Sequence, residues 1–492
     1  MTATTRPLAA QAQAQVTGVI RDTAGGAVPN AKITLRNLAT GVIFTATSNE
    51  DGIYRFLSIP AARYMASSTV TGFKTFEQGP ITVQVADILN LDVTLQLGEA
   101  SEKIVVTESA ESLQTQTATV GAVVTTREIE NLPLNVRDPL ALVGLTPGVT
   151  FGANFGSGGG QETGRNFFKS DFNVGGGRSG SQELLLDGVP NTTADVNRAV
   201  INPPVDSVQE FKVQTNSYDA EFGRTSGGVV NVITKSGAND LHGLAYDFER
   251  HSFIEANNFF NNRSGIPNPS FKRHQFGGNV SGPIIKNKTF FFADYEGLRQ
   301  GFPITFISTV PTALQRAGNF SQTVAANGSP ITVYDPNTLT TLANGTRQRS
   351  PFPGNIVPSD RQDPVAKKIA SFYPLQNLPG DSVTGQNNYV RSAGSTINTD
   401  KWDARADQNF GENTRLFGRY SQQKDVRLVP GPLAGVIGGG RSTTDTYHQA
   451  VTDFTRVLTP NLILTAQFGF SRALAAQFGL SRGFDIASLG TC

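Results

Sequence analysis

Apolar and polar residues alternate in short runs along the first hundred positions. Residues 33–36, 81–85 and 89–97 each place an apolar side chain at every second position, and turn sequences such as Asp51-Gly52 separate the runs. Period-two alternation broken by turns every ~8 to 12 residues is typical of a β-sandwich. A segment of this size can bury a modest core of its own. We therefore predict a sandwich over 15–98.

The middle of the chain has short unbroken apolar runs instead. Residues 184–186 and 229–233 are apolar-rich and lie close to Gly or Pro, as expected for buried strands. Glycine clusters at 156–160 and 175–177 suit tight turns or close backbone approach. A phosphate-binding loop would also need a Lys followed by Ser or Thr, which neither cluster has. We therefore reject that reading of the glycines.

Alternation returns in the C-terminal half. Leu244, Tyr246 and Phe248 alternate with Asp247 and Glu249. Transmembrane barrel strands alternate in this way, with apolar residues toward lipid and polar residues toward the lumen. A soluble sandwich alternates too, so the period alone does not decide between them. For a barrel, we expect the aromatic pair to face lipid and the carboxylates to face the lumen.

Residues 300–400 show little alternation and are rich in Pro, Asn, Ser and Gly, whereas 402–407 and 462–470 alternate again. We predict long loops at 300–400. In outer-membrane barrels such loops lie on the extracellular side, and loops of this kind commonly contact ligands.

Composition narrows the function classes. The length of 492 residues suggests about three domains, and 41 Lys and Arg against 40 Asp and Glu argue against a nucleic-acid partner. A single cysteine, Cys492, excludes an internal disulfide and a cysteine-rich zinc site. No apolar run approaches the ~18 to 20 residues of a membrane-spanning helix. A membrane protein of this composition would therefore cross as a β-barrel.

Catalytic motifs are not recognisable. His251 and Glu255 form H-x-x-x-E, which is not the H-E-x-x-H of zinc proteases. The four histidines are scattered, and the G-x-S-x-G element of serine hydrolases does not occur. We predict no enzymatic activity, no cofactor and no metal site.

The first segment resembles a known domain. Residues 16–22, 26–31, 51–56 and 71–73 are similar to the carboxypeptidase regulatory-like domain. The resemblance implies a prealbumin-like seven-stranded sandwich. It implies no peptidase activity, because that domain is an accessory to the enzyme.

Residues 111–237 resemble the plug of TonB-dependent outer-membrane receptors, most closely the Oar-like branch, in motifs at 129–134, 145–149, 183–189, 208–213 and 227–237. The motif positions that we expect to be structural are Arg137, Gly177, Arg178, Asp187, Gly188, Glu210, Phe211, Gly227 and Gly228.

Residues 238–492 resemble the opening of the Oar-like barrel, in motifs at 257–260, 276–278 and 289–297. Outer-membrane transporters have about 22 strands of ~9 to 11 residues each, whereas this region has room for about ten. We expect an unclosed barrel and a fragment of a longer receptor. The predicted fold class is mainly β: a prealbumin-like sandwich, a small α+β plug and an incomplete antiparallel transmembrane barrel.

A linker over 99–110 contains a segment that resembles the TonB box, formed by Lys103, Ile104, Val105, Val106, Thr107 and Glu108. An extended segment can add as a strand to a partner's sheet. The resemblance implies TonB, energised by the inner-membrane ExbB–ExbD complex, as a partner, beside outer-membrane lipid and a ligand carried by the receptor.

The leading hypothesis is energy-coupled uptake or translocation through a plugged barrel in the outer membrane of a Gram-negative bacterium. Siderophore, cobalamin, oligosaccharide and peptide cargo are all compatible with it, because the loops that select the ligand vary most. The alternative is a cell-surface binding or adhesion protein without transport; a secreted peptidase would need a catalytic site. Residues 1–14, with the small-x-small sequence Ala12-Gln13-Ala14, are either a signal-peptide remnant or a disordered tail.

Overall fold

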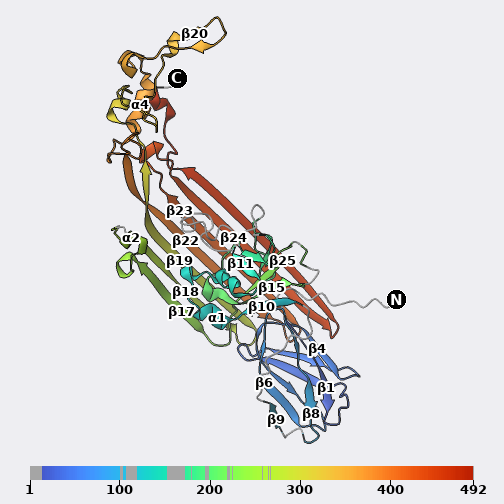
Figure 1. The fold of residues 1–492 in the computed structure, drawn as a ribbon. Coiled ribbons are helices and arrows are strands. Elements are labelled where there is room, and N and C mark those ends of the chain that lie inside the picture. The colour runs from blue at the N-terminus through green and yellow to red at the C-terminus, as the bar shows by residue number, and fades with distance from the viewer. Residues whose placement is uncertain are drawn as a thin grey trace.

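The structure is a computed structural model. It describes residues 14–99, 103–106, 119–151, 172–178, 180–193, 199–218, 222–223, 225–257, 259–263, 265 and 267–490. The chain is mainly β and has three parts (Figure 1): a sandwich at one end, a long curved sheet, and a plug against that sheet. The predicted fold class is confirmed. Among the described residues, no helix is both long and apolar enough to cross a membrane.

The sandwich consists of two sheets. Its strands are β1 (Ala14–Asp22), β2 (Lys32–Asn37), β3 (Ile43–Thr47), β4 (Ile53–Ile59), β5 (Ala62–Ser68), β6 (Thr75–Val83), β7 (Ile88–Asn90), β8 (Val93–Leu95) and β9 (Lys103–Val106). One sheet has the order β4-β1-β7, with β8 also paired to β1; the other has the order β3-β2-β5-β6-β9. Because β7 and β8 both pair in parallel with β1, they act as one interrupted strand.

The sandwich core follows from the alternation in the sequence. Every second residue of β1 from Ala14 to Ile20 is buried, and the residues between them are partly exposed. Tyr54 and Tyr64 are almost fully buried. Their hydroxyl groups donate hydrogen bonds to the carbonyls of Leu91 and Pro60. Burial raises the pKa of both tyrosines above the ordinary value.

The plug is a small mixed sheet with short helices. Its elements are β10 (Val120–Val124), α1 (Thr126–Asn131), β11 (Val149–Phe151), β12 (Phe172–Val174), β13 (Glu183–Leu186), β14 (Val189–Pro190), β15 (Val208–Asn216) and β16 (Val229–Thr234). Five strands form a sheet of order β10-β15-β16-β13-β14, and β11 pairs with β12. A capping box of Thr125 and Glu128 starts α1. Short 3-10 helices span Asn135–Arg137, Pro139–Leu145 and Val205–Ser207.

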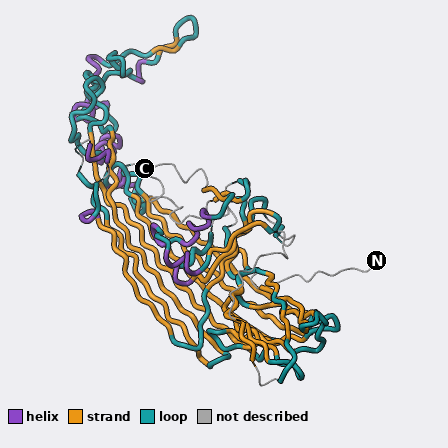
Figure 2. The backbone as a smooth tube through the Cα atoms, turned by 60° about the horizontal axis from the view of Figure 1, so that its bottom comes forward, coloured by secondary structure: helices purple, strands orange, loops and turns teal. Residues whose placement is uncertain are grey.

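The third part is a seven-stranded antiparallel sheet. Its strands are β17 (His242–His251), β18 (Lys272–Ile285), β19 (Thr289–Ser308), β22 (Tyr389–Asn409), β23 (Thr414–Val429), β24 (Arg441–Thr459) and β25 (Leu462–Gly479). Each strand pairs with its neighbours in this order, and among the described residues β17 and β25 have one neighbour each. The sheet curves around the plug and is open (Figure 2).

The two faces of this sheet differ in polarity. Trp402, Tyr420, Phe468 and Phe470 lie on the outer face and are about half exposed or more. Rows of polar side chains on the inner face are buried against the plug; they include Asp294, Glu296, Lys401, Asp403, Arg419, Gln423 and Gln449. This is the arrangement expected of transmembrane strands, apolar toward lipid and polar toward the lumen.

Our prediction for β17 was wrong. The guanidinium of the plug residue Arg137 lies 4.5 Å from the ring centre of Tyr246 and 4.6 Å from that of Phe248, so both rings face the plug. Asp247 and Glu249 lie on the opposite, outer face. The alternation shows that the strand has two different faces, but it does not show which face points toward the plug. Aromatic rings are favourable on the inner face here because a cation of the plug lies against them.

The prediction that 300–400 is mostly long loops was wrong at both ends of that range. Strand β19 continues to Ser308, and β22 begins at Tyr389 and pairs with it throughout. These strand ends extend beyond the plug with both faces partly exposed, so alternation is not required there. Pro303 pairs with Gly394 in this stretch, and Pro and Gly both resemble loop residues.

Between these strands, residues 309–388 form a projection at the end of the sheet opposite the sandwich (Figure 1). It contains α3 (Ala313–Arg316), β20 (Thr340–Thr341), β21 (Arg347–Gln348) and α4 (Pro364–Phe372), while α2 (Phe259–Arg263) lies in the β17–β18 connection. Further 3-10 helices lie at Ser252–Ile254, Pro336–Thr338, Pro353–Asn355, Ser359–Arg361, Gly435–Ile437 and Ile486–Leu489.

Candidate plug and partner-binding sites

A single plug carboxylate lies between two arginines of the surrounding sheet. Asp187 follows β13, and its Oδ2 atom accepts a 2.6 Å hydrogen bond from Nε of Arg419 on β23. Its Oδ1 lies 3.3 Å from Nη1 of Arg405 on β22. The backbone N–H and the hydroxyl of Thr234 donate to the two oxygens at 2.9 and 2.8 Å. We call Asp187, Arg405 and Arg419 the lock.

The lock is buried and electrostatically matched. Asp187 is 1% exposed. Burial alone would raise the pKa of Asp187, but the two guanidinium groups and the hydrogen bonds from Thr234 outweigh it and hold that pKa below its ordinary value. Gln467 on β25 also donates to the backbone carbonyl of Asp187, at 3.1 Å. The backbone at Asp187 is left-handed, with φ 51°, and Gly188 follows at φ 80°.

Arg137 makes a second plug–sheet contact. Its guanidinium pairs with Asp206 of the plug, lies 3.8 Å from Glu296 on β19, and stacks on the two rings of β17. Glu296 in turn accepts a 2.9 Å hydrogen bond from Lys401 on β22. These residues connect the plug to β17, β19 and β22, whereas Arg419 connects it to β23.

The plug also holds the sandwich. Glu210 on β15 accepts a short hydrogen bond from the backbone N–H of Val85, and Lys212 donates from Nζ to the carbonyl of Ala86 at 2.7 Å. Ala86 has a left-handed backbone, with φ 50°. We call residues 85–87, which follow β6, the hook. Burial, with a smaller contribution from Asp87, raises the pKa of Glu210 to about 7, against the opposing effects of the Val85 N–H and Lys212.

Contacts with the curved sheet reinforce this docking. Arg415 on β23 donates to the Ser58 hydroxyl at 2.8 Å. Asn239 donates from its backbone and its side chain to the carbonyls of Ala39 and Thr40, at 3.0 and 2.6 Å. A cavity of about 230 Å³ lies where sandwich, plug and sheet meet.

The other predicted plug residues have structural positions. Phe211 is fully buried in the plug core. A Cβ at Gly177 would lie 2.6 Å from the Cα of Gly227, and Gly228 has a φ of 86°. The backbone carbonyl of Arg178 accepts hydrogen bonds from Ser181. The structure therefore brings Gly177 close to Gly227 and Gly228, whereas Gly188 lies beside Asp187.

Sequence reasoning missed the basic partners of these sites. Arg405 was recognised as part of a polar strand face, but its partner Asp187 is 218 positions away. Lys212 lies inside the plug motif at 208–213 but was not singled out, and Arg419 lies in no motif. The sequence shows each of them only as a charged residue in a strand, which does not identify its partner.

The segment predicted to bind TonB is partly described. Lys103–Val106 form β9, which pairs in parallel with β6 at the edge of the sandwich sheet. Thr107 and Glu108 lie outside the described residues. The assignment of this segment to TonB stays a prediction.

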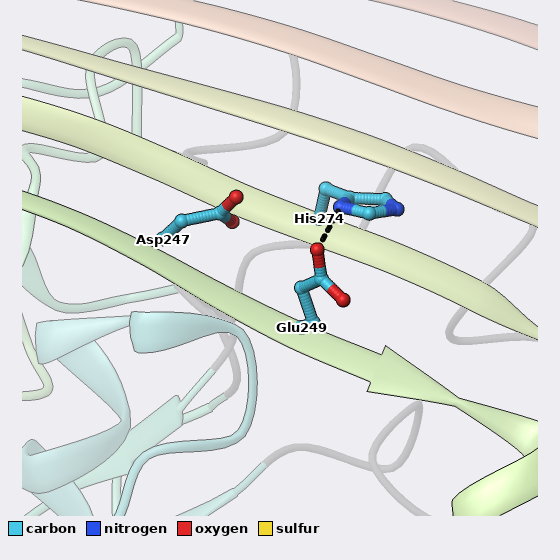
Figure 3. Close-up of side chains that lie close together, drawn as sticks. All are labelled: Asp247, Glu249 and His274. Atoms are coloured by element: carbon cyan, nitrogen blue, oxygen red, sulfur yellow. Dashed lines mark ion pairs between the residues drawn. The ribbon is translucent and has the colours of Figure 1, made fainter.

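One cluster of potential metal ligands lies on the outer face of the sheet (Figure 3). Asp247 and Glu249 on β17 and His274 on β18 place one ligand atom each within 4.8 Å of one another, and the His274 and Glu249 side chains are 3.2 Å apart. Sequence reasoning considered His251 with Glu255 and missed this group, because its members lie on adjacent strands. The two carboxylates are exposed, and we assign the cluster no function.

Comparison with known proteins places the chain in a family. Residues 233–491 match the outer membrane beta barrel domain and residues 15–96 the carboxypeptidase regulatory-like domain. The TonB-dependent transporter Oar of Myxococcus xanthus is 24% identical over 289 residues, which are 53% of this chain and 25% of that protein. The chain thus spans about a quarter of the curated relative that it matches.

Solved structures that the chain resembles in part include the outer membrane transporter YddB from Escherichia coli, with 13% identity, 73% of this chain and 40% of that chain covered, and a TM-score of 0.47. A mutant ferric enterobactin receptor from Pseudomonas aeruginosa has 13% identity, 73% and 46% coverage and a TM-score of 0.35. The resemblance to Oar-like receptors read from the sequence is confirmed by the Oar relative. The chain belongs to the outer membrane beta barrel domain family and is a protein of the Gram-negative outer membrane.

Proposed function

We propose that this protein acts in energy-coupled transport across the outer membrane, as part of a TonB-dependent receptor. The observation that carries the proposal is the lock: a plug carboxylate buried between two arginines of a curved transmembrane sheet. A plug held by buried ion pairs stays in place until work is done on it, because separating such a pair leaves a charge buried without a partner. The similarity to a TonB-dependent transporter supports this reading.

In this proposal a ligand binds at the outer end, where the projection 309–388 lies (Figure 1). The projection is held together by its own contacts, including a 2.7 Å ion pair between Arg361 and Asp335. TonB, energised by the ExbB–ExbD complex, engages the segment at 103–106 and pulls on the plug. The apolar outer face of the sheet contacts outer-membrane lipid. We assign the chain no catalytic role, since its relatives are transporters and receptors.

The segment at 103–106 precedes the first strand of the plug along the chain. Strand β10 follows the segment and pairs with β15 at the edge of the plug sheet, so a pull would reach the plug first at β10. Strand β15 pairs in turn with β16, which supplies the Thr234 contacts to Asp187. The lock therefore lies two strands from the point of pull.

Binding to TonB tests the proposal. The full chain in detergent should bind the purified periplasmic domain of TonB, and a variant lacking 103–108 should not. A variant lacking 343–346, in the β20–β21 turn, shortens the chain at a distant position and serves as the control. Equal binding by both deletion variants would refute the TonB assignment and favour the alternative, a surface-binding protein without transport.

A further inference from the structure

The edge strand β9 has a backbone edge without a strand neighbour among the described residues. In the sheet order β3-β2-β5-β6-β9, β9 is the last strand. Its four residues pair in parallel with β6, from Thr75 opposite Lys103 to Gln78 opposite Val106. Edge strands with open backbone groups are templates for the addition of another strand.

The two edges of this sheet have different surroundings. At the opposite edge, Thr45 on β3 donates to Glu412 in the β22–β23 turn, so that edge lies against the curved sheet. Strand β9 lies at the far end of the sandwich, away from the plug and the curved sheet (Figure 1). Val105 is 58% exposed there. The open edge of β9 is therefore accessible from the side where an inner-membrane protein would approach.

Strand β6 links this edge to the plug. Its first half carries β9, at residues 75–78, and its last residue, Val83, lies two positions before the hook. The hook is held by Glu210 and Lys212 on β15. A load applied to β9 would therefore pass along β6 to the same plug strand that receives the direct pull through β10.

We propose that TonB adds a strand to the outer edge of β9 while β9 stays paired with β6, so that the sandwich sheet is part of the TonB-binding surface. This rests on the proposed function. An already extended strand loses less conformational entropy on binding than a free segment does. Release of β9 before binding would instead break four residue pairs and leave the edge of β6 open. The sandwich then moves as a rigid body and transmits the force applied by TonB to the plug through the hook.

A disulfide between β6 and β9 tests this. Glu77 and Val105 are paired residues, and Glu77→Cys with Val105→Cys in a Cys492→Ser background joins the strands. The control pair, Lys32→Cys with Thr47→Cys, joins the paired strands β2 and β3 at exposed positions. Affinity for the TonB periplasmic domain is measured for the full chain, oxidised and reduced.

We expect the oxidised 77–105 variant to bind with a Kd within about threefold of the reduced form, as the control pair does. A larger loss that reduction reverses would overturn the proposal, because it would mean that β9 must leave β6. If the reduced variants and the native chain do not bind TonB, the assignment of 103–106 fails and the inference fails with it.

Hydrogen exchange gives a second measurement, which needs no engineered bond. With TonB bound, amides at 75–78 should keep their protection and amides at 103–106 should gain protection. Loss of protection at 75–78 on binding would overturn the proposal.

Discussion

Lys212 of the plug donates from Nζ to the backbone carbonyl of Ala86 in the sandwich, 2.7 Å away. The carboxylate of Glu210, two residues earlier on the same face of β15, accepts from the N–H of Val85. A cation and an acid thus hold adjacent peptide groups of one turn. These two side chains link the sandwich to the plug by polar contacts, whereas the main hydrophobic clusters of the two parts are separate.

Lys212→Met should loosen the sandwich from the plug. The substitution keeps the length of the side chain but removes a charged donor, which typically costs about 1.5 to 3 kcal/mol. Protease cleavage near the hook should become faster in the full chain, while the plug and the curved sheet stay resistant. Lys74→Met, on the sandwich between β5 and β6, is the matched control, and equal cleavage of the two variants would contradict the role of Lys212.

Docking of the sandwich should also weaken as the pH rises. The pKa of Glu210 is raised to about 7 in the folded protein, above its ordinary value of 4.5. The folded state therefore holds the proton more tightly than the unfolded state, so this group's contribution to stability is full below the unfolded pKa and is lost as pH rises through about 7.

Hydrogen exchange at the hook, followed from pH 5 to pH 8 after correction for intrinsic rates, measures this effect. The native chain should lose protection across the range, whereas Glu210→Gln, which is neutral at every pH, should keep it. A pH profile unchanged by the substitution would assign the transition to another group.

Loss of the lock carboxylate should destabilise the plug strongly. Asp187→Ala removes the carboxylate that two buried guanidinium groups share, although Arg405 keeps Asp407 and Arg419 keeps Gln449 as a partner. Breaking a buried pair typically costs about 3 to 5 kcal/mol. The full chain is unfolded with denaturant in detergent, and proteolysis of the plug monitors the transition. The shift of the transition gives the loss in free energy of unfolding. Asp335→Ala removes a solvent-exposed ion pair with Arg361 and should leave the transition unchanged.

Because the pKa of Asp187 is lowered, the stability of the plug should also depend on pH in the acid range. Its stabilising effect is present above the unfolded pKa and is lost as pH falls through the lower folded pKa. The native plug should therefore loosen in strong acid by a step that Asp187→Asn lacks. An identical acid profile for Asp187→Asn and the native chain would rule out the lock as its origin.

The apolar part of the outer face, around Phe468 on β25, should not tolerate a charged residue. Phe468 is 67% exposed on β25, and an arginine on the lipid face of a barrel costs about 2 to 4 kcal/mol near the midplane. Phe468→Arg should reduce the share of protein that stays in outer membranes after a carbonate wash. Ile331→Arg, on the projection, is also an exposed apolar position and should not change retention.

The sandwich and the plug strands could be predicted because their residues meet local requirements. The buried positions of β1 carry no polar side chain because they face the sandwich core, and this requirement does not depend on a distant partner. Gly228 is glycine because its backbone is left-handed. The direction of β17 could not be predicted in the same way. Its aromatic face is decided by Arg137, more than a hundred positions earlier, and alternation alone is symmetric between the two faces of a sheet.

The lock was beyond sequence reasoning for the same reason. Asp187 is part of a recognisable plug motif, but the motif does not say what the carboxylate binds. Arg419 is one of many charged residues on inward strand faces. Only the register of β22 and β23 against the plug brings the three charges together.

The lock also bears on the order in which the molecule assembles. The bond from Gln467 to Asp187 spans 280 positions, and the one from Arg419 to Asp187 spans 232. Contacts this distant form late, because a long loop must close first. Until Asp187 is in place, Arg405 and Arg419 have no plug carboxylate to bury against. The plug thus serves as a template: the wall that encloses it can reach its final, dry packing only around a plug that has already folded.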